Sequence, residues 1–355
     1  MSERAAGAER AEQRGRAAVE ALRADPTAVA GTEAGVWFEA GWKRRIARRL
    51  FMRLPRPLRP RDVAFWAEVR AAATGDEWRR LTRSSYVALY YHRLAGEGKD
   101  GQERIDLPAE LFAAQLRLLR LLRFRPLAPE DVVAFHAGKL RELPSRSFVV
   151  TADDAFRDVV EPFLRHADAR PVVFVPTQEV GGRSWWAGDE PVASWEELER
   201  LARAGVALGS HTRRHASLPG LEPAALADEL EGSRRDLEQR DGFVPLLAYP
   251  HGRSDEAARR AAAAAGFRAA FTTDPGRNGA GTDPYLLRRI GVKAWDSRLS
   301  FLWKVVTGEL LPPRWEAWRI RRARRSSRRR RPTRAPRGGG AAAPPDPARA
   351  RRPRP

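Results

Sequence analysis

The chain has 355 residues, of which 43% are hydrophobic, and its formal net charge at pH 7 is +20. That length and apolar content are enough to bury a sizeable core in one large domain or two ordinary ones. The sequence contains no cysteine, so disulfide bonds and thiolate zinc sites are excluded. Any metal must therefore be bound by histidine and carboxylate side chains.

Residues 1–82 have the composition of an Arg-rich helical leader, interrupted by Pro55, Pro57 and Pro60 and without a strand-like run. The first 30 residues are rich in Ala, Glu and Arg and lack the apolar stretch of a secretory signal, so we expect no cleaved signal peptide. No run of about 18 apolar residues occurs, so no membrane span is expected and the expected location is cytoplasmic.

From residue 86 onward, short apolar runs alternate with amphipathic segments of helix length. The runs, each with the helix expected after it, are 86–91 and 108–123, 148–151 and 158–165, 172–175 and 195–204, 206–209 and 222–239, and 246–249 and 255–265. Two further runs, 269–272 and 286–292, complete the series. This alternation predicts parallel strands joined by helical crossovers, and six or seven such strands suit a barrel as well as an open sheet.

Chemically active side chains follow two of these runs. Asp153 and Asp154 are adjacent after the second run, and His211 and His215 lie four residues apart after the fourth. Two imidazoles and one carboxylate can bind a divalent ion such as zinc and leave a position open for water, while the other carboxylate stays free as a base. Adjacent acids can also simply cap a helix. The shared position at strand ends, where α/β folds place ligands, favours the metal site.

Basic residues are concentrated in segments on both sides of the alternating region. Residues 42–58 and 299–320 both mix aromatic side chains with arginine, as interfacial helices do, although helices that pack on a domain share this composition. From Arg319 to Pro355 there are fifteen Arg and one acid, Asp346, so this tail carries +14 of the +20. It has too little apolar surface to fold and is predicted to be disordered. Its charge would attract anionic lipid, acidic polysaccharide or nucleic acid, or would serve solubility alone.

Four motifs between residues 86 and 292 resemble those of polysaccharide deacetylases of the NodB-homology, carbohydrate esterase 4 type. Thr-Ala-Asp-Asp-Ala-Phe at 151–156 is similar to the family's Thr-Phe-Asp-Asp-Gly-Tyr/Phe motif, and Ser-His-Thr-Arg-Arg-His at 210–215 to its His-Ser/Thr-x-x-His motif. Ala-Tyr-Pro-His-Gly at 248–252 and Tyr-Tyr-His-Arg-Leu at 90–94 resemble the branch that includes the bacterial poly-N-acetylglucosamine deacetylases.

The resemblance implies a distorted (β/α) barrel in which Asp154, His211 and His215 bind a divalent metal, usually zinc. It implies that Asp153 is the base that activates the attacking water, and that His92, on an N-terminal strand that closes the barrel, protonates the departing amine. Without the resemblance, a lone histidine such as His92 after an aromatic strand would be interpreted as structural.

The same resemblance gives a substrate-binding role to the turn containing Tyr249 and His251, where the backbone N–H of His251 would stabilise the oxyanion. Trp185 and Trp186 could stack on a sugar ring, since flat aromatic faces suit a pyranose, or could only cover the barrel.

The chain departs from the family pattern at three positions. Ala152 replaces a Phe, Ala155 replaces the Gly after the two carboxylates, and His251 replaces a Tyr. A methyl group at Ala155 would narrow the pocket, or require a different turn if the Gly there had a positive φ. None of these changes removes a metal ligand.

The predicted organisation is a helical leader over 1–82, a deacetylase-like domain over 83–297, an amphipathic helical segment over 298–320 and a disordered basic tail over 321–355. The predicted function is removal of N-acetyl groups from an N-acetylhexosamine in a polysaccharide, cell-wall glycan or lipid-linked glycan. The Arg-rich flanks would hold the enzyme at the inner face of an anionic membrane. The alternatives are a catalytically degenerate glycan-binding or scaffold domain, and nucleic-acid association through the tail, although nothing in the core supports base readout.

Overall fold

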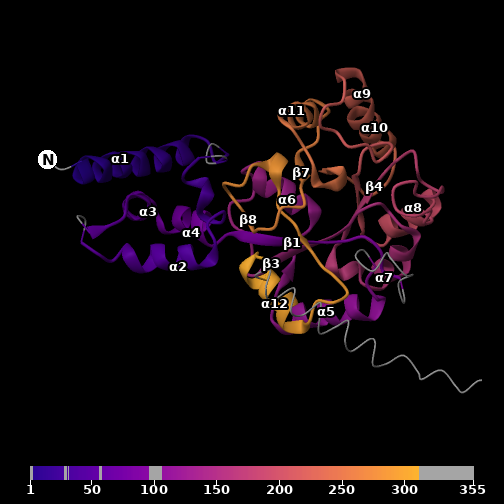
Figure 1. The fold of residues 1–355 in the computed structure, drawn as a ribbon, viewed down its shortest axis with the longest axis horizontal. Helices are drawn as coiled ribbons and strands as arrows, with labels where there is room; N and C mark the ends of the chain where they lie inside the picture. The colour runs from indigo at the N-terminus through magenta and orange to yellow at the C-terminus, as the bar shows by residue number, and fades with distance from the viewer. Residues whose placement is uncertain (1–2, 28–29, 31, 56–57, 96–105, 312–355) are drawn as a thin grey trace, which may run out of the picture. The chain divides into compact units, whose positions relative to one another are not determined.

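The structure is a computed structural model that describes residues 3–27, 30, 32–55, 58–95 and 106–311 (Figure 1). Residues 1–311 form one compact unit. The predicted basic tail and residues 312–320 of the predicted amphipathic segment lie outside the described residues. In the part of the chain that is described, no helix combines the length and the apolar character needed to cross a bilayer.

The first part of the chain is helical: its helices are α1 (Glu3–Ala24), α2 (Trp42–Phe51), α3 (Arg61–Ala72) and α4 (Gly75–Thr82). The prolines act as the sequence predicts, because α2 ends before Pro55 and α3 begins directly after Pro60. Helices α1 and α3 pack together. The core of this group is aromatic, with the ring of Trp37 edge-on to Trp66 at 4.7 Å and to Trp78 at 5.7 Å.

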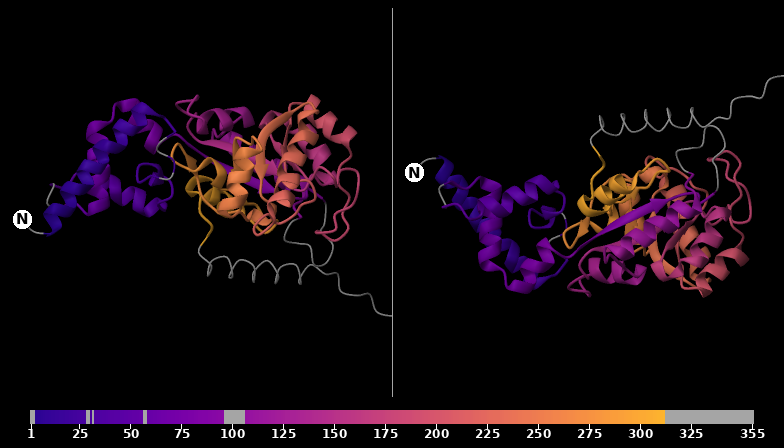
Figure 2. Two further views of the ribbon diagram at one scale, coloured as in Figure 1. Left: turned by 90° about the horizontal axis from the view of Figure 1, so that it is seen from above. Right: turned by 90° about the horizontal axis from the view of Figure 1, so that it is seen from below.

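The strands all belong to the later part of the chain (Figure 2). They are β1 (Ser85–Tyr91), β2 (Arg125–Pro126), β3 (Ser147–Ala152), β4 (Val172–Val175), β5 (Ala207–Ser210), β6 (Phe243–Ala248), β7 (Ala269–Phe271), β8 (Asn278–Gly279) and β9 (Ile290–Gly291). Their order is β7-β6-β5-β4-β3-β1-β8, with β2 paired to β3 and β9 paired to β1. All pairs are parallel except that of β1 with β8.

The chain after β7 joins the two ends of the sheet. Leu287 forms a parallel bridge with Phe271 of β7, and three residues later Ile290 of β9 pairs with Leu89 of β1. The ring is therefore closed by a short, irregular segment, and the predicted distorted (β/α) barrel is confirmed. The prediction that the strand before His92 takes part in the closure is also correct, since β1 lies between β3 and β9.

Helices α5 (Ala109–Leu121), α7 (Val160–Arg165), α8 (Trp195–Arg203) and α12 (Arg298–Thr307) contribute to one large apolar cluster with alternate residues of the strands. The other strand face forms a second cluster, in which Phe174 of β4 meets Phe271 of β7 at 5.7 Å. Because β4 and β7 are not neighbours in the sheet, this contact crosses the inside of the barrel. Both strand faces are buried, as expected for parallel strands covered by helices.

The structure differs from the sequence-based expectations at α6 (Pro129–His136), α9 (Pro223–Ala227) and α10 (Ser233–Glu238). Helix α6 was not predicted, and its Val132 and Phe135 belong to the interior cluster. The helix expected over 222–239 is divided into α9 and α10 by a π-helical turn at Asp228–Gly232. Helix α11 (Glu256–Ala264) follows β6 as expected.

Candidate metal centre

Asp154, His211 and His215 come together at the C-terminal ends of β3 and β5. The Oδ1 atom of Asp154 lies 3.4 Å from Nε2 of His211 and 3.1 Å from Nε2 of His215. All three side chains are at most 5% exposed. They form the one group of three potential metal ligands found among the described residues. The two motifs that are 57 residues apart in sequence therefore supply one site.

The backbone of β6, beside His211, fixes the tautomer of this imidazole. Its Nδ1–H donates a hydrogen bond to the backbone carbonyl of Ala248 at 2.7 Å, which leaves the Nε2 lone pair directed at Asp154. Oδ1 of Asp154 has no hydrogen-bond partner among the described residues, although it is buried. A carboxylate oxygen and imidazole lone pairs repel one another unless a cation lies between them. The donor set therefore fits a divalent metal.

The same contacts shift the pKa values of these groups. Burial by itself favours the neutral form of Asp154, but the adjacent imidazoles of His211 and His215 outweigh it and lower the pKa of the carboxyl. Burial also opposes the charged form of His211, yet Asp154 and Asp153 raise its pKa. Burial lowers the pKa of His215. The carboxylate is thus ionised and ready to bind a metal throughout the neutral range.

Asp153 points to a different partner, as expected for adjacent side chains at a strand end. Its two carboxylate oxygens accept hydrogen bonds from the guanidinium of Arg289, at 2.6 Å and 2.8 Å. Arg289 is 0% exposed and lies over the rings of Tyr90 and Phe174 inside the barrel. Burial alone would raise the pKa of Asp153, but the charge of Arg289 outweighs it and lowers that pKa. This bidentate ion pair keeps Asp153 ionised and fixes its orientation.

Sequence reasoning did not identify Arg289. The available signal was an arginine within the run 286–292, which is otherwise largely apolar. A charged residue in a run that is otherwise buried needs a buried partner of opposite charge, so this position was informative.

The segment carrying both histidines is held by Glu229, which was also not predicted. One carboxylate oxygen of Glu229 accepts hydrogen bonds from the backbone N–H groups of Arg213 and Arg214, at 2.9 Å and 3.0 Å. Glu229 lies in the π-helical turn and is 1% exposed. A β-carbon at Gly232 in the same turn would lie 2.2 Å from the Arg213 side chain, so any larger residue there would displace that side chain. The irregular turn thus braces the segment between the two histidines.

The backbone around the site takes up left-handed conformations. Asp154, Ala155, Thr212, His215 and His251 all have φ between +49° and +69°. Such conformations are unfavourable for residues with a β-carbon, and they concentrate at functional sites. Ala155, which replaces the family's Gly, has φ +49° and is fully buried. The chain therefore keeps the turn that suits glycine and carries the strain of the extra methyl group.

Two further imidazoles face the ligand group. His92 interacts electrostatically with Asp153 and Asp154, and burial lowers its pKa. The ring of His251 is 5.0 Å from that of His215, nearly perpendicular to it, and burial lowers its pKa as well. His251 is exposed, so its side chain lies at the mouth of the site. Both predicted residues are thus in the neighbourhood of the metal ligands.

Trp185 and Trp186 differ in their exposure and in the rings that they contact. The ring of Trp186 stacks on His215, with centroids 4.4 Å apart and planes at 10°. Trp185 meets Trp186 edge-on and is 67% exposed. Trp186 therefore covers one face of a metal ligand, whereas Trp185 has a free surface beside the site. The sequence left open whether these rings stack on a sugar or only cover the barrel. Trp186 has a covering role, and of the two rings only that of Trp185 has a surface free for stacking.

Tyr249 lies apart from this group. Its ring is fully buried in the cluster beneath α11, and its hydroxyl donates a hydrogen bond to the carbonyl of Tyr285 at 3.2 Å. Burial raises the pKa of this phenol. The side chain thus supports the turn at 250–252 from below, so any substrate contact from Tyr249 would have to come from its backbone.

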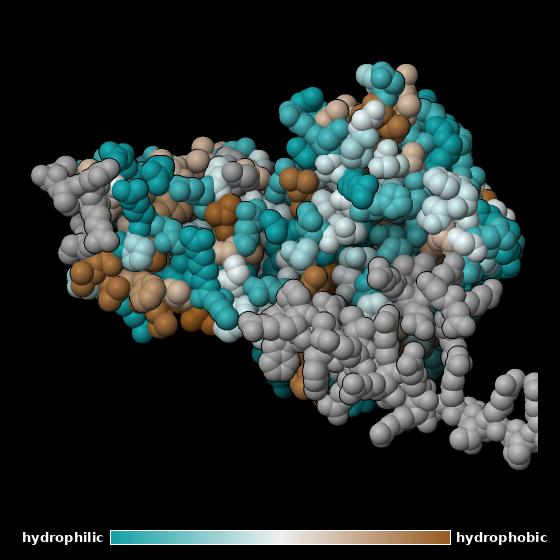
Figure 3. All heavy atoms as spheres, viewed as in Figure 1, coloured by the Kyte–Doolittle hydropathy of each residue, from teal (hydrophilic) through white to brown (hydrophobic). Residues whose placement is uncertain are grey.

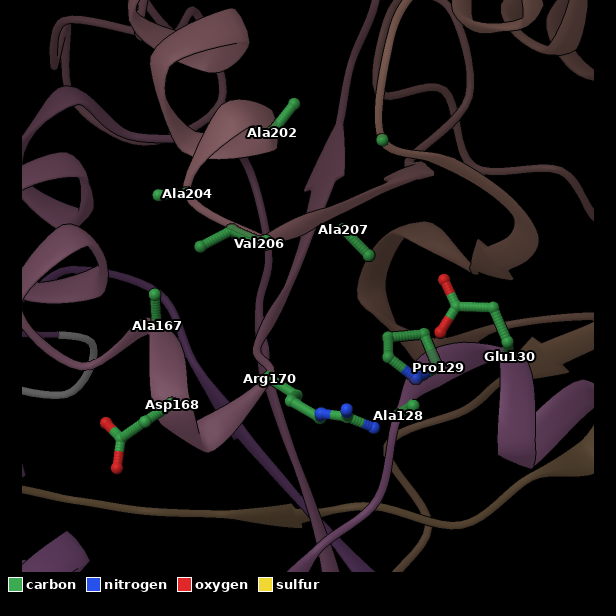
Figure 4. A pocket seen from close by; sticks show the side chains of 12 residues that line it. Ala128, Pro129, Glu130, Ala167, Asp168, Arg170, Ala202, Ala204, Val206 and Ala207 are labelled. Carbon is green, nitrogen blue, oxygen red and sulfur yellow. The ribbon is translucent and has the colours of Figure 1, made fainter.

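The opposite end of the barrel contains a hollow of about 460 Å³ (Figure 4). Its walls include Pro129 and Glu130 of α6, Arg170 before β4, and Val206 and Ala207 at the start of β5. These residues lie at the N-terminal ends of the strands, away from the ligands, and none of the side chains around the hollow is a histidine. In barrels of this kind that end contributes to stability, so the site is assigned to the C-terminal ends.

Residues 141–270 match the sequence profile of the family described as polysaccharide deacetylase. YxkH of Bacillus subtilis (strain 168), which carries the name of a polysaccharide deacetylase, is 22% identical over 217 residues, covering 60% of this chain and 73% of that protein.

Solved structures show the same fold. BA0330 from Bacillus anthracis aligns with a TM-score of 0.55 and 20% identity over 63% of this chain and 69% of its own. The deacetylase PplD from Streptococcus pyogenes aligns with a TM-score of 0.54 and 20% identity, over 64% of this chain and 100% of its own. IcaB from Ammonifex degensii aligns with a TM-score of 0.53 and 21% identity, over 63% of this chain and 97% of its own. The motifs, the sequence profile over residues 141–270 and the named relative agree in one respect: each shows similarity to the polysaccharide deacetylase family.

Proposed function

We propose that this protein is a zinc-dependent hydrolase that removes N-acetyl groups from an N-acetylhexosamine-containing glycan. The observation that carries the proposal is the buried group of Asp154, His211 and His215, with Asp153 beside it as a separate, ionised carboxylate. Zinc prefers nitrogen and oxygen ligands and four-coordination, which three protein ligands leave incomplete. When bound, the metal would polarise the acetyl carbonyl and acidify water.

Asp153 would take the proton from the attacking water. Its pKa is low, so it is present as carboxylate, and each oxygen keeps a lone pair besides the one that accepts from Arg289. The water oxygen then adds to the carbonyl carbon. Arg289 would hold the base in place but does not itself accept or donate the proton.

His92 in its imidazolium form, which the charges of Asp154 and Asp153 favour and burial opposes, would supply the proton that the departing amine requires. Breaking the bond between carbonyl carbon and nitrogen yields acetate and an amino sugar, and an imidazole facing the two aspartates is suited to that transfer. The backbone N–H of His251 would stabilise the negative charge on the carbonyl oxygen. The exposed ring of Trp185 would stack on the sugar, with Trp186 holding the face of His215.

The experiment is a measurement of acetate released from N-acetylglucosamine oligomers and cell-wall glycan by zinc-loaded protein. Asp153→Asn and His211→Ala should each reduce release by about 100-fold or more, because each removes a group on which the chemistry depends. His166→Ala, a change at a half-exposed histidine at the C-terminal end of α7, serves as the control and should retain activity. Equal release by parent and Asp153→Asn would refute the mechanism.

A second candidate, a glycan-binding domain without turnover, is favoured by the two departures next to the site, Ala155 and His251. It predicts no acetate release from any of these glycans by the parent protein. It also predicts glycan binding that is unchanged in Asp153→Asn, measured by calorimetry with the same oligomers.

A further inference from the structure

Exposed apolar side chains are concentrated on two helices. Among the described residues, nine large apolar side chains are exposed, and seven of them lie on α2 and α12 or within seven residues after these helices. The seven are Ile46, Leu50, Phe51, Leu58, Leu299, Val306 and Leu310. Single exposed apolar residues are common on any protein, whereas a concentration of this kind indicates a surface that something covers.

On α2, the exposed residues form a stripe with cations at both ends. Lys43, Ile46, Leu50 and Arg53 follow one another at intervals of three or four residues, so they share one face of the helix and the turn after it. Ile46 is 47% and Leu50 57% exposed. The opposite face is anchored, because Arg48 is buried against the rings of Trp37 and Trp66.

Helix α12 has the same two-sided character. Phe301 and Val305 are buried in the barrel cluster, and Lys304 is buried on the same side, where it pairs with Asp296 at 2.6 Å. The other face carries Leu299, which is 80% exposed, and Val306, which is 54% exposed. Unlike the buried face, this face has no partner among the described residues that accounts for its apolar side chains.

The two helices meet. The backbone N–H of Trp42, at the start of α2, donates a hydrogen bond to the carboxylate of Glu309 at 2.9 Å, just after α12. The rings of Trp42 and Trp303 lie edge to face at 5.7 Å. Arg45 also donates to the carbonyl of Thr307 at 3.3 Å. These contacts join segments 262 and 267 residues apart in sequence, and we call the exposed faces of the two helices the α2–α12 surface. Figure 3 shows apolar residues along the lower edge of the helical leader, where α2 lies, among hydrophilic neighbours.

The charge of the α2–α12 surface selects its partner. Helix α2 contains five basic residues in ten and no acid, and the residues from Arg319 onward add fifteen Arg against one Asp. A second copy of the chain would bring like charges together, which opposes self-association. Phosphate groups of a nucleic acid would satisfy the cations but not the exposed apolar side chains. Apolar residues flanked by arginine, with tryptophan between them, match the boundary of an anionic bilayer.

We propose that the α2–α12 surface docks on an anionic lipid bilayer, inserting Ile46, Leu50 and Val306 at the level of the headgroups while Lys43 and Arg53 pair with lipid phosphates. The contact is peripheral, since the stripes are short. This inference does not depend on the proposed deacetylase activity, because neither helix supplies a residue of the metal centre.

The test is sedimentation of the full-length protein with vesicles of phosphatidylcholine and phosphatidylglycerol, and with phosphatidylcholine alone. The parent should bind the anionic vesicles and not the neutral ones. The double variant Ile46→Gln/Leu50→Gln should lower the partition coefficient at least tenfold, and Leu299→Gln/Val306→Gln should do the same. Leu121→Gln is the matched control, because Leu121 is 78% exposed and lies on α5, which is neither of the two helices of this surface.

Three results would overturn the proposal. The first is no binding of the parent to anionic vesicles. The second is equal binding by both double variants and the parent, which would assign the attraction to the basic tail alone. The third is a parent dimer that the double variants dissociate, measured by sedimentation velocity, which would make the surface an interface between copies. The unfolding temperature of each variant confirms that it is folded, since all four positions are exposed.

Discussion

The barrel and the helical leader are held together by different physical means. In the barrel, buried charges occur in pairs, such as Arg289 with Asp153 and Lys304 with Asp296, each at 2.6 Å at its shortest contact. In the leader, the core consists of tryptophan rings, and arginines stack on its edge, as Arg48 does on Trp37. The comparison teaches that each of these buried charges in the barrel has a close partner of opposite charge, whereas the buried Arg48 of the leader lies against aromatic rings and has only a longer contact with Asp62, at 3.4 Å.

Removing the Arg289 guanidinium is expected to have the largest effect. Arg289→Met leaves the Asp153 carboxylate buried without its partner and should lower the free energy of unfolding by about 3 to 5 kcal/mol. Acetate release should be lost as well, because the base is no longer held. The adjacent change Arg288→Met is the control, since this side chain is 30% exposed and its ion pair with Glu39 is long, at 3.7 Å. If Arg289→Met and Arg288→Met lowered the free energy of unfolding equally in chemical denaturation, the special role of the buried pair would be contradicted.

Removing a ring from the leader should destabilise the protein without affecting the site. Trp66→Ala deletes a side chain that is 1% exposed, and we expect a loss of about 3 kcal/mol in chemical denaturation. The zinc content of the folded variant, measured by elemental analysis, should stay at the parent value. A loss of zinc together with stability would show that the leader supports the metal centre and would weaken the contrast between the regions.

A buried histidine in the barrel should make the stability depend on pH. Burial lowers the pKa of His136 to about 3, and its Nε2 lies 3.0 Å from the hydroxyl of Tyr86. Between pH 6.5 and 3 the unfolded chain binds a proton that the folded one does not, so stability decreases as the pH falls, by at most about 1.4 kcal/mol per pH unit.

The variant His136→Asn should flatten this dependence, measured as unfolding free energy at pH 4, 5 and 7. His166→Asn is the control, because that imidazole is half-exposed. If the parent and His136→Asn lose the same stability between pH 7 and pH 4, other groups are responsible for the acid sensitivity.

The two tryptophans at the site should separate metal binding from substrate binding. Trp186→Ala removes the ring stacked on His215, so we expect zinc affinity to fall by about tenfold in a competition titration with a chelator. Trp185→Ala should leave zinc affinity unchanged and raise KM for the glycan several-fold at constant kcat, the smallest effect of the series. A change in zinc affinity for Trp185→Ala, or none for Trp186→Ala, would reverse the assignment.

The sequence alone determined much of this protein. The alternation of apolar runs and amphipathic segments predicted parallel strands with helical crossovers, because the periodicity of each element is a local property of the chain. The choice of a barrel over an open sheet came from the resemblance of the motifs to a known family. The positions of Asp154, His211 and His215 after two strands predicted one site, and the structure places the histidines 3.4 Å and 3.1 Å from Oδ1 of Asp154. Residues just after parallel strands share one end of a barrel. The prolines of the leader marked its helix ends for the same local reason.

Tertiary structure decided the partners of these residues. Asp153 and Arg289 are 136 residues apart, and only closure of the ring through β9 brings them together. The separate environments of Trp185 and Trp186, the bracing of the histidine segment by Glu229 and the meeting of α2 with α12 likewise depend on contacts between distant elements. A local pattern specifies which side chains stand at a strand end. The side chain that each one meets is set by packing, which no single stretch of sequence contains.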